Sequence, residues 1–183
     1  RVPAGHNKVI YIGSLPGPSS SQIWDMAANY SGAVWMVVNE PNRRPNYDAD
    51  LIVEDLHDIY RIIKAADPTA KLMSPMILNW EFTCTLCIGY QTGHSWLREF
   101  RAEYIAAYGE EPPIDIWAIN AYPLDWANLP TVNPGIPIRQ ISGLRKFLDG
   151  IPAQRDKPIW VTELSLHWGW DRIYIGRDDC GDT

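Results

Sequence analysis

The sequence predicts an α/β fold with a parallel sheet, because short apolar runs alternate along the chain with longer amphipathic segments. Strands buried on both faces give continuous apolar runs of this kind. Alternation of strand and helix is typical of parallel sheets joined by right-handed crossovers. The apolar runs lie at residues 9–12, 33–38, 71–78, 114–119 and 159–161, and polar or Pro- and Gly-rich segments follow them.

Amphipathic segments separate these strands. The clearest is the helix predicted over residues 50–66, where buried-type residues recur at spacings of four, three and four from Ile52. A second helix is predicted to begin at a Ser95 cap and to end at Gly109 in the left-handed conformation. The other two follow the serine cluster at residues 19–21 and precede Gly150. The predicted order is therefore β-α-β-α throughout.

The spacing of the strand ends leaves two architectures open. The ends lie near residues 13, 40, 78, 121 and 163, so each step has room for a loop, a helix and a return strand. A doubly wound open sheet and a (β/α) barrel both fit this order. No glycine-rich nucleotide-binding motif follows a strand, which favours the barrel. A complete TIM-type barrel takes about 250 residues. We therefore expect residues 1–183 to form one incomplete barrel domain of five units.

Composition narrows the class of function. The net charge is -6 without an acidic block, and the basic residues are scattered, so nucleic acid is not an expected partner. No apolar run approaches the ~20 residues that a membrane span needs, so no membrane partner is expected. Nine tryptophans and nine tyrosines accompany three phenylalanines. Rings with a flat apolar face and a polar edge suit carbohydrate-binding clefts, although core packing is the simpler alternative for any one of them.

The cysteines leave several readings open. Cys84 and Cys87 form a C-x-x-C pair, and Cys180 lies far from both. A structural zinc site, a loop disulfide and ordinary thiols are the alternatives, and zinc would need further ligands such as His94. No convincing His/Asp cluster follows the strands, so we expect neither a catalytic metal nor another cofactor.

Two glutamates end buried strands. Glu40 follows the apolar run at residues 33–38, and Glu163 follows the run at residues 159–161. In parallel barrels, functional side chains project from the carboxyl ends of strands. A carboxylate there is costly unless it is paired, hydrogen-bonded or used, and a rim salt bridge is the alternative to catalysis. Two carboxyl groups flanking a sugar divide the work of glycosidic cleavage, since one protonates the leaving oxygen while the other attacks carbon or activates water.

Four landmarks then give a specific resemblance. Asn39-Glu40-Pro41-Asn42 and Trp160-Val161-Thr162-Glu163 resemble the acid/base and nucleophile motifs of the large clan of retaining (β/α)8 glycoside hydrolases. Residues 58–71 resemble the helix and turn after their fourth strand, and residues 114–123 resemble their sixth strand. The resemblance covers about residues 30–168. It implies that the motifs end strands four and seven, so that strands three to seven are present and the first, second and eighth are absent.

The resemblance also implies roles for individual residues. Glu40 would be the general acid/base, Glu163 the nucleophile, and Asn39 a hydrogen-bond partner of the sugar 2-hydroxyl. Tyr122 would lie near the nucleophile. Asn120 stands where these enzymes often have a histidine, which leaves the orienting network open and makes Asn120 a candidate contact of the substrate.

Residues after the strands are the candidates for the cleft walls. Rings that could stack on sugar faces are Trp80, Trp126, Trp168 and Trp170. His167 would hydrogen-bond a sugar or tune a carboxylate, with a solvated loop histidine as the alternative. Arg43 and Arg44 would line a subsite or lie on the surface. Tryptophans within strands are expected in the core, namely Trp35, Trp117 and Trp160.

These features favour a retaining glycoside hydrolase that cleaves O-glycosidic bonds in a poly- or oligosaccharide. The alternative is a non-catalytic carbohydrate-binding protein on the same barrel. We expect the incomplete barrel to be inactive by itself, because it exposes strand edges and holds only part of the site. Polysaccharide hydrolysis suggests secretion, although no leader opens the chain. Xylan, β-glucan, mannan and small glycosides remain open as substrates, and so does the oligomeric state.

Overall fold

The computed structural model describes residues 7–43, 47–81, 91–123 and 133–164. The predicted alternation of strands and helices is confirmed. In chain order the elements are β1 (Val9–Ile12), α1 (Ser20–Asn29), β2 (Val34–Val37), the short 3-10 helix η1 (Pro41–Arg43), α2 (Ala49–Ala66), β3 (Lys71–Leu72), β4 (Ile77–Leu78), α3 (Gly93–Tyr108), β5 (Trp117–Asn120), α4 (Gly135–Asp149) and β6 (Ile159–Glu163).

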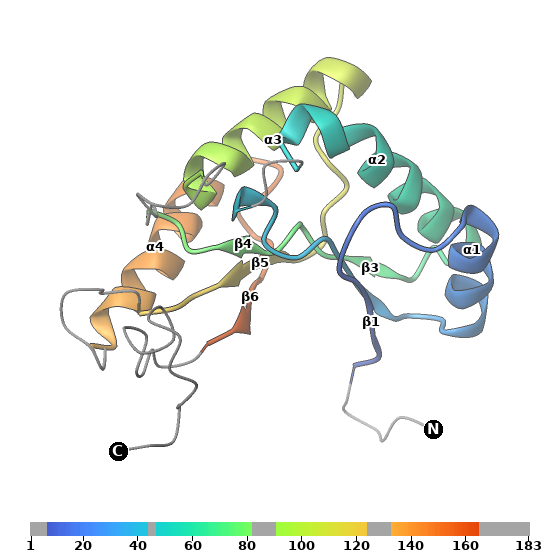
Figure 1. Ribbon diagram of the computed structural model, residues 1–183, viewed down its shortest axis with the longest axis horizontal. Helices are drawn as coiled ribbons and strands as arrows, with labels where there is room; N and C mark the ends of the chain where they lie inside the picture. The colour runs from blue at the N-terminus through green and yellow to red at the C-terminus, as the bar shows by residue number, and fades with distance from the viewer. Residues whose placement is uncertain (1–6, 44–46, 82–90, 124–132, 165–183) are drawn as a thin grey trace, which may run out of the picture.

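All paired strands run parallel. One ladder has the order β1-β2-β3 and the other the order β4-β5-β6. Isolated parallel bridges between Asn39 and Met76 and between Met73 and Ile116 join the two ladders. In Figure 1 the strands follow an inner arc and the four α-helices lie along its outer side. This is the arrangement of an incomplete TIM-type barrel, as the sequence predicts.

The segment predicted as one strand at residues 71–78 is divided into β3 and β4. Pro75 has no N–H to donate, so it cannot continue a hydrogen-bonded ladder. At the break, the Ser74 hydroxyl accepts the backbone N–H of Ala118 at 2.9 Å. Met73 and Met76 still donate to β2 and its extension, at 3.0 and 3.1 Å. β3 and β4 therefore fill one position of the barrel, kinked in the middle.

Successive strand residues point to opposite faces of the sheet. Trp35 and Trp117 are fully buried in the large core between sheet and helices, as predicted. A smaller cluster on other strand positions contains Val34, Met73, Met76, Ile116 and Ala118. Trp160 is only partly buried against this smaller cluster, so the expectation of a core position holds for it only in part.

Helix ends follow the local sequence. Ser19 caps α1 in a capping box, since its hydroxyl accepts from the Gln22 N–H and the Gln22 side chain accepts from the Ser19 N–H. The prediction of Ser95 as the cap of α3 is wrong. Thr92, with an extended backbone, accepts the Ser95 N–H at 3.0 Å, so the helix begins earlier, at Gly93. Gly109 has a φ of 72° at the end of α3, as predicted.

None of the helices in the described ranges is long and apolar enough to span a membrane. The same ranges contain no group of three or more His, Cys, Asp or Glu side chains that could hold a metal ion. Cys84, Cys87 and Cys180 lie outside the described residues.

Candidate active site

The backbone leaves β2 through a constrained turn that places Glu40. Val38 and Glu40 have positive φ angles of 64° and 47°, a region that residues with a Cβ rarely adopt. Neighbouring strands hold the turn: the Val38 N–H donates to Ile12 at 2.7 Å, and the Glu40 N–H donates to Met76 at 2.8 Å. Such conformations persist where the surroundings fix them, and they cluster at functional sites. Two residues with unfavourable positive φ angles therefore fix the position of Glu40 after β2.

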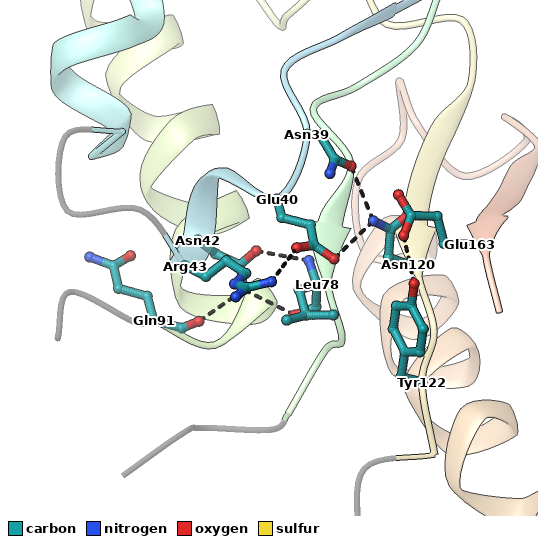
Figure 2. Close-up of polar contacts among 9 residues, drawn as sticks. All are labelled: Asn39, Glu40, Asn42, Arg43, Leu78, Gln91, Asn120, Tyr122 and Glu163. Carbon is teal, nitrogen blue, oxygen red and sulfur yellow. Dashed lines mark hydrogen bonds and ion pairs between the residues drawn. The ribbon is translucent and has the colours of Figure 1, made fainter. Parts of the chain in front are cut away.

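The Asn42 side chain anchors the segment that follows Glu40. Its side-chain Nδ2 donates to the carbonyls of Leu78 at 3.0 Å and Gln91 at 2.9 Å, and its Oδ1 accepts the Leu78 N–H at 2.8 Å (Figure 2). Only 1% of the residue is exposed. Asn42 therefore fastens the loop that carries Glu40 onto the end of β4, a structural role that the motif alone did not reveal.

The Glu40 carboxylate is sheltered and has two partners. The residue is 8% exposed. Its Oε2 pairs with Arg43 Nη1 at 3.0 Å, and its Oε1 accepts from Asn120 Nδ2 at 3.1 Å. A buried carboxylate needs such charge-assisted bonds to offset its lost hydration. Arg43, expected in a subsite or on the surface, contacts the candidate acid/base directly.

Asn120 joins three strand ends. It lies at the end of β5 and is 0% exposed. Besides Glu40, its Nδ2 donates to Asn39 Oδ1 at 3.1 Å, and its Oδ1 accepts from the Thr162 hydroxyl at 2.6 Å. Asn39 follows β2, and Thr162 precedes Glu163 in β6. The amide thus connects the surroundings of the two glutamates (Figure 2).

Glu163 ends β6 and is exposed. Its Oε2 accepts a hydrogen bond from the Tyr122 hydroxyl at 2.6 Å. Burial raises the pKa of the Tyr122 phenol, and the hydrogen bond to Glu163 and the negative charges of Glu163 and Glu40 raise it further, against a smaller opposite effect of Arg43. The phenol therefore stays neutral and can donate. Asn120 links Glu40 to Thr162, the residue before Glu163, so the two predicted glutamates lie in one hydrogen-bonded neighbourhood.

Asn79, at the end of β4, supports Tyr122 and was not identified from the sequence. Its φ is 50°, and it is fully buried. Its Oδ1 accepts the Tyr122 N–H at 2.8 Å, and its own N–H donates to the Asn120 carbonyl at 2.9 Å. The sequence feature that could have identified Asn79 is its position, since it is the polar residue directly after the apolar run at residues 71–78. Glu40 and Asn120 hold similar positions after their own apolar runs.

Trp80 differs from the expectation of a cleft wall. It is 3% exposed, and its ring packs against Phe147 and His94, with ring centroids 5.4 and 4.7 Å away. The side chain of Gln140 on α4 accepts the Trp80 N–H at 2.6 Å. Gly143 leaves room for the indole, since a Cβ there would lie 2.1 Å from Trp80 Cδ1. The ring belongs to the packing against α4, so it has no face left for a sugar.

Several other candidates fall in ranges that the structure does not describe. These are Arg44, Trp126, His167, Trp168 and Trp170. Their assignment to the cleft stays a prediction.

The fold is similar to that of three solved glucanases. A GH128 (subgroup II) endo-β-1,3-glucanase from Pseudomonas viridiflava aligns with a TM-score of 0.60 and 23% identity, over 85% of this chain and 51% of that one. The GH128 (subgroup II) endo-β-1,3-glucanase from Sorangium cellulosum aligns with a TM-score of 0.54 and 18% identity, over 87% of this chain and 57% of that one. A GH128 (subgroup I) endo-β-1,3-glucanase from Amycolatopsis mediterranei, in complex with laminaritriose, aligns with a TM-score of 0.53 and 19% identity, over 92% of this chain and 61% of that one.

These identities establish the fold alone. The chain spans about half to three fifths of the length of these glucanases, as their covered shares of 51%, 57% and 61% show. A comparison with curated protein sequences finds no significant match. A family model described as the glycosyl hydrolase catalytic core matches residues 4–170. That match takes in both glutamates and all of the described residues, and the chain belongs to the glycosyl hydrolase catalytic core family.

Proposed function

We propose that the protein carrying this chain hydrolyses O-glycosidic bonds with net retention, using Glu40 as acid/base and Glu163 as nucleophile. The observation that carries the proposal is the shared environment of the two carboxylates. Glu40 follows β2 and Glu163 ends β6, and Asn120 links Glu40 to Thr162, the residue before Glu163. Two carboxyl groups brought together at the carboxyl ends of barrel strands are what glycosidic cleavage needs.

The reaction takes place in two displacements. In the first, Glu163 attacks the anomeric carbon and forms an ester, the glycosidic C–O bond breaks, and Glu40 gives its proton to the leaving oxygen. In the second, Glu40 takes a proton from water, the water oxygen bonds to the anomeric carbon, and the ester breaks to release Glu163. The Tyr122 hydroxyl holds Glu163 Oε2 and so orients the carboxylate for attack.

β-1,3-Glucan is the substrate class that we propose. The glucanases with a similar fold are endo-β-1,3-glucanases, and one of them is in complex with laminaritriose. The sheltered carboxylate of Glu40 and the positive φ angles of its loop support a site in this chain. Endo cleavage within a β-1,3-linked chain is therefore the activity to test first.

The test is hydrolysis of a set of polysaccharides by the full-length protein. Laminarin, β-1,4-glucan, xylan and mannan are compared by release of reducing ends. We expect cleavage of laminarin, and a loss of more than about 10⁴-fold in kcat for Glu163→Gln, because no other group can form the ester.

Glu54→Gln, on the exposed surface of α2, is the matched control and should retain activity. Thermal unfolding of each variant checks that it is folded. A Glu163→Gln variant that keeps its activity would refute the role of Glu163. Binding of laminarin without any hydrolysis would instead favour a non-catalytic carbohydrate-binding protein.

A further inference from the structure

We infer that Asn120 is the positioning residue of the acid/base, and that the Thr162 hydroxyl holds its amide in place. The importance of this role for catalysis rests on the proposed function, whereas the geometry can be tested without substrate. The sequence suggested a different role, that of a contact to the sugar. The hydrogen bonds in Figure 2, together with that to Thr162, argue against a sugar contact.

Every polar group of the Asn120 side chain is already occupied. An amide offers two N–H bonds and one carbonyl oxygen. The two N–H bonds are directed to Glu40 Oε1 and Asn39 Oδ1, each at 3.1 Å, and the oxygen accepts from Thr162 at 2.6 Å. Because the residue is 0% exposed, water cannot replace these partners. Asn120 therefore acts on a sugar only through Glu40 and Asn39.

The Glu40 carboxylate determines which way the amide faces, because an ionised carboxylate only accepts hydrogen bonds. A flipped Asn120 would place its oxygen against Glu40 Oε1 and would lose the bond that its Nδ2 makes there. Its oxygen instead faces the Thr162 hydroxyl, which can donate. Glu40 after β2 thus selects the orientation of the amide, and Thr162 in β6 supports it. The residue beside the candidate nucleophile therefore helps to hold the donor that faces the acid/base.

This orientation assigns different tasks to the two oxygens of Glu40. Oε1 accepts from the buried amide of Asn120, whereas Oε2 pairs with Arg43, whose side chain is 54% exposed and can turn toward solvent. We therefore place the proton that Glu40 donates on Oε2, with the Arg43 side chain displaced from it. The proton is therefore presented on the Arg43 side of the carboxyl group. Asn120 fixes the carboxyl plane and stabilises the carboxylate that remains after proton transfer.

The first test uses NMR of the 15N-labelled protein without substrate. Asn120→Asp identifies the side-chain amide signals of Asn120 by their loss. We expect these signals to shift as Glu40 ionises, and to lose this pH dependence in Glu40→Gln. Signals that do not respond to pH in the wild-type protein would overturn the inference, whether or not the protein is an active glycosidase.

The second test uses kinetics on laminarin with the full-length protein. Asn120→Asp keeps the shape of the side chain but replaces the donor by an acceptor. Adjacent carboxyl groups share a proton and ionise as a pair. We expect kcat to fall about 100-fold, the alkaline limb of the pH–kcat profile to move upward by about one pH unit, and KM to change little.

A pair of substitutions at Thr162 keeps the inference testable if Asn120→Asp does not fold. Thr162→Val removes the hydroxyl but keeps the shape, and it should lower kcat about tenfold. Thr162→Ser retains a hydroxyl and should recover most of that loss. Equal kcat values and pH profiles for Thr162→Val and wild type would overturn the inference, as would a rise in KM alone. Absence of activity in the wild-type protein would count against the proposed function, and the NMR result would then decide the inference independently.

Discussion

The two candidate catalytic glutamates lie in contrasting surroundings. Glu40 is 8% exposed, with an arginine on one carboxylate oxygen and an amide on the other, and its loop is fixed to β4 by Asn42. Glu163 is exposed at the end of β6, where the Tyr122 hydroxyl holds one oxygen. Glu40 is enclosed by neighbouring strand ends, whereas Glu163 lies at the border of the described sheet.

The strands differ in burial in the same way as the two glutamates. All four residues of β5 are buried between β4 and β6. The outer strands expose apolar residues, with Val9 at 48%, Tyr11 at 56% and Val161 at 40%. In a closed barrel each strand has neighbours on both sides, which removes such edges. The surroundings of Glu40 are therefore formed almost entirely by the described strands, and those of Glu163 only on the β5 side.

The largest difference between the two glutamates should appear when Glu40 is replaced. A general acid contributes roughly 10²- to 10⁴-fold to a step with a poor leaving group, and much less when the leaving group is already activated. Glu40→Ala in the full-length protein should lose activity on laminarin by about that factor. It should retain the first step on an activated aryl glycoside, measured as the burst of released phenol.

Azide provides the control for this prediction. It attacks the ester without general-base help, in the space left by the glutamate side chain, so the second step should be partly restored. The product should be a glycosyl azide with the configuration of the substrate. Equal losses on both substrate types, with no azide product, would return Glu40 to a structural role.

A smaller effect is expected from Tyr122→Phe. This change removes the hydrogen bond to Glu163, and a bond to a charged group contributes about 1.5 to 3 kcal/mol. We expect kcat to fall roughly 10- to 100-fold, with a smaller change in KM. Because the pKa of the Tyr122 phenol is raised, the wild-type protein should show no loss of activity from its ionisation near pH 10. A Tyr122→Phe enzyme with unchanged kcat would show that Glu163 needs no support from this side.

The sequence predicts the framework well because strands and helices here have clear periodicity. The sequence analysis missed local features in which a single residue changes the hydrogen bonding. Pro75 divides a single apolar run into β3 and β4, and Thr92 takes the capping position expected for Ser95. Both the strand break and the helix cap depend on which backbone groups need a hydrogen-bond partner. The periodicity of apolar residues gives no information about those partners.

The candidate site likewise contains residues that the sequence indicates and residues that only the structure reveals. Glu40 and Glu163 could be singled out as candidates because a charged residue after an apolar run is conspicuous. Asn79 and the role of Asn42 could not, since amides are common in loops and their partners come from distant segments. Trp80 misled because its position after a strand suggested a cleft, whereas Gly143 on α4 creates the space that receives its ring. Packing across elements, which a single sequence does not show, decides these cases.

The stereochemistry of the first product tests the central claim most directly. Retention requires two displacements at the anomeric carbon, with carboxyl groups about 5 to 5.5 Å apart, whereas inversion requires about 6.5 to 9.5 Å. Proton NMR of laminarin hydrolysis by the full-length protein, recorded before mutarotation, distinguishes the two outcomes. We predict that the new reducing end appears first as the β-anomer. Initial formation of the α-anomer would contradict the assignment of Glu163 as nucleophile.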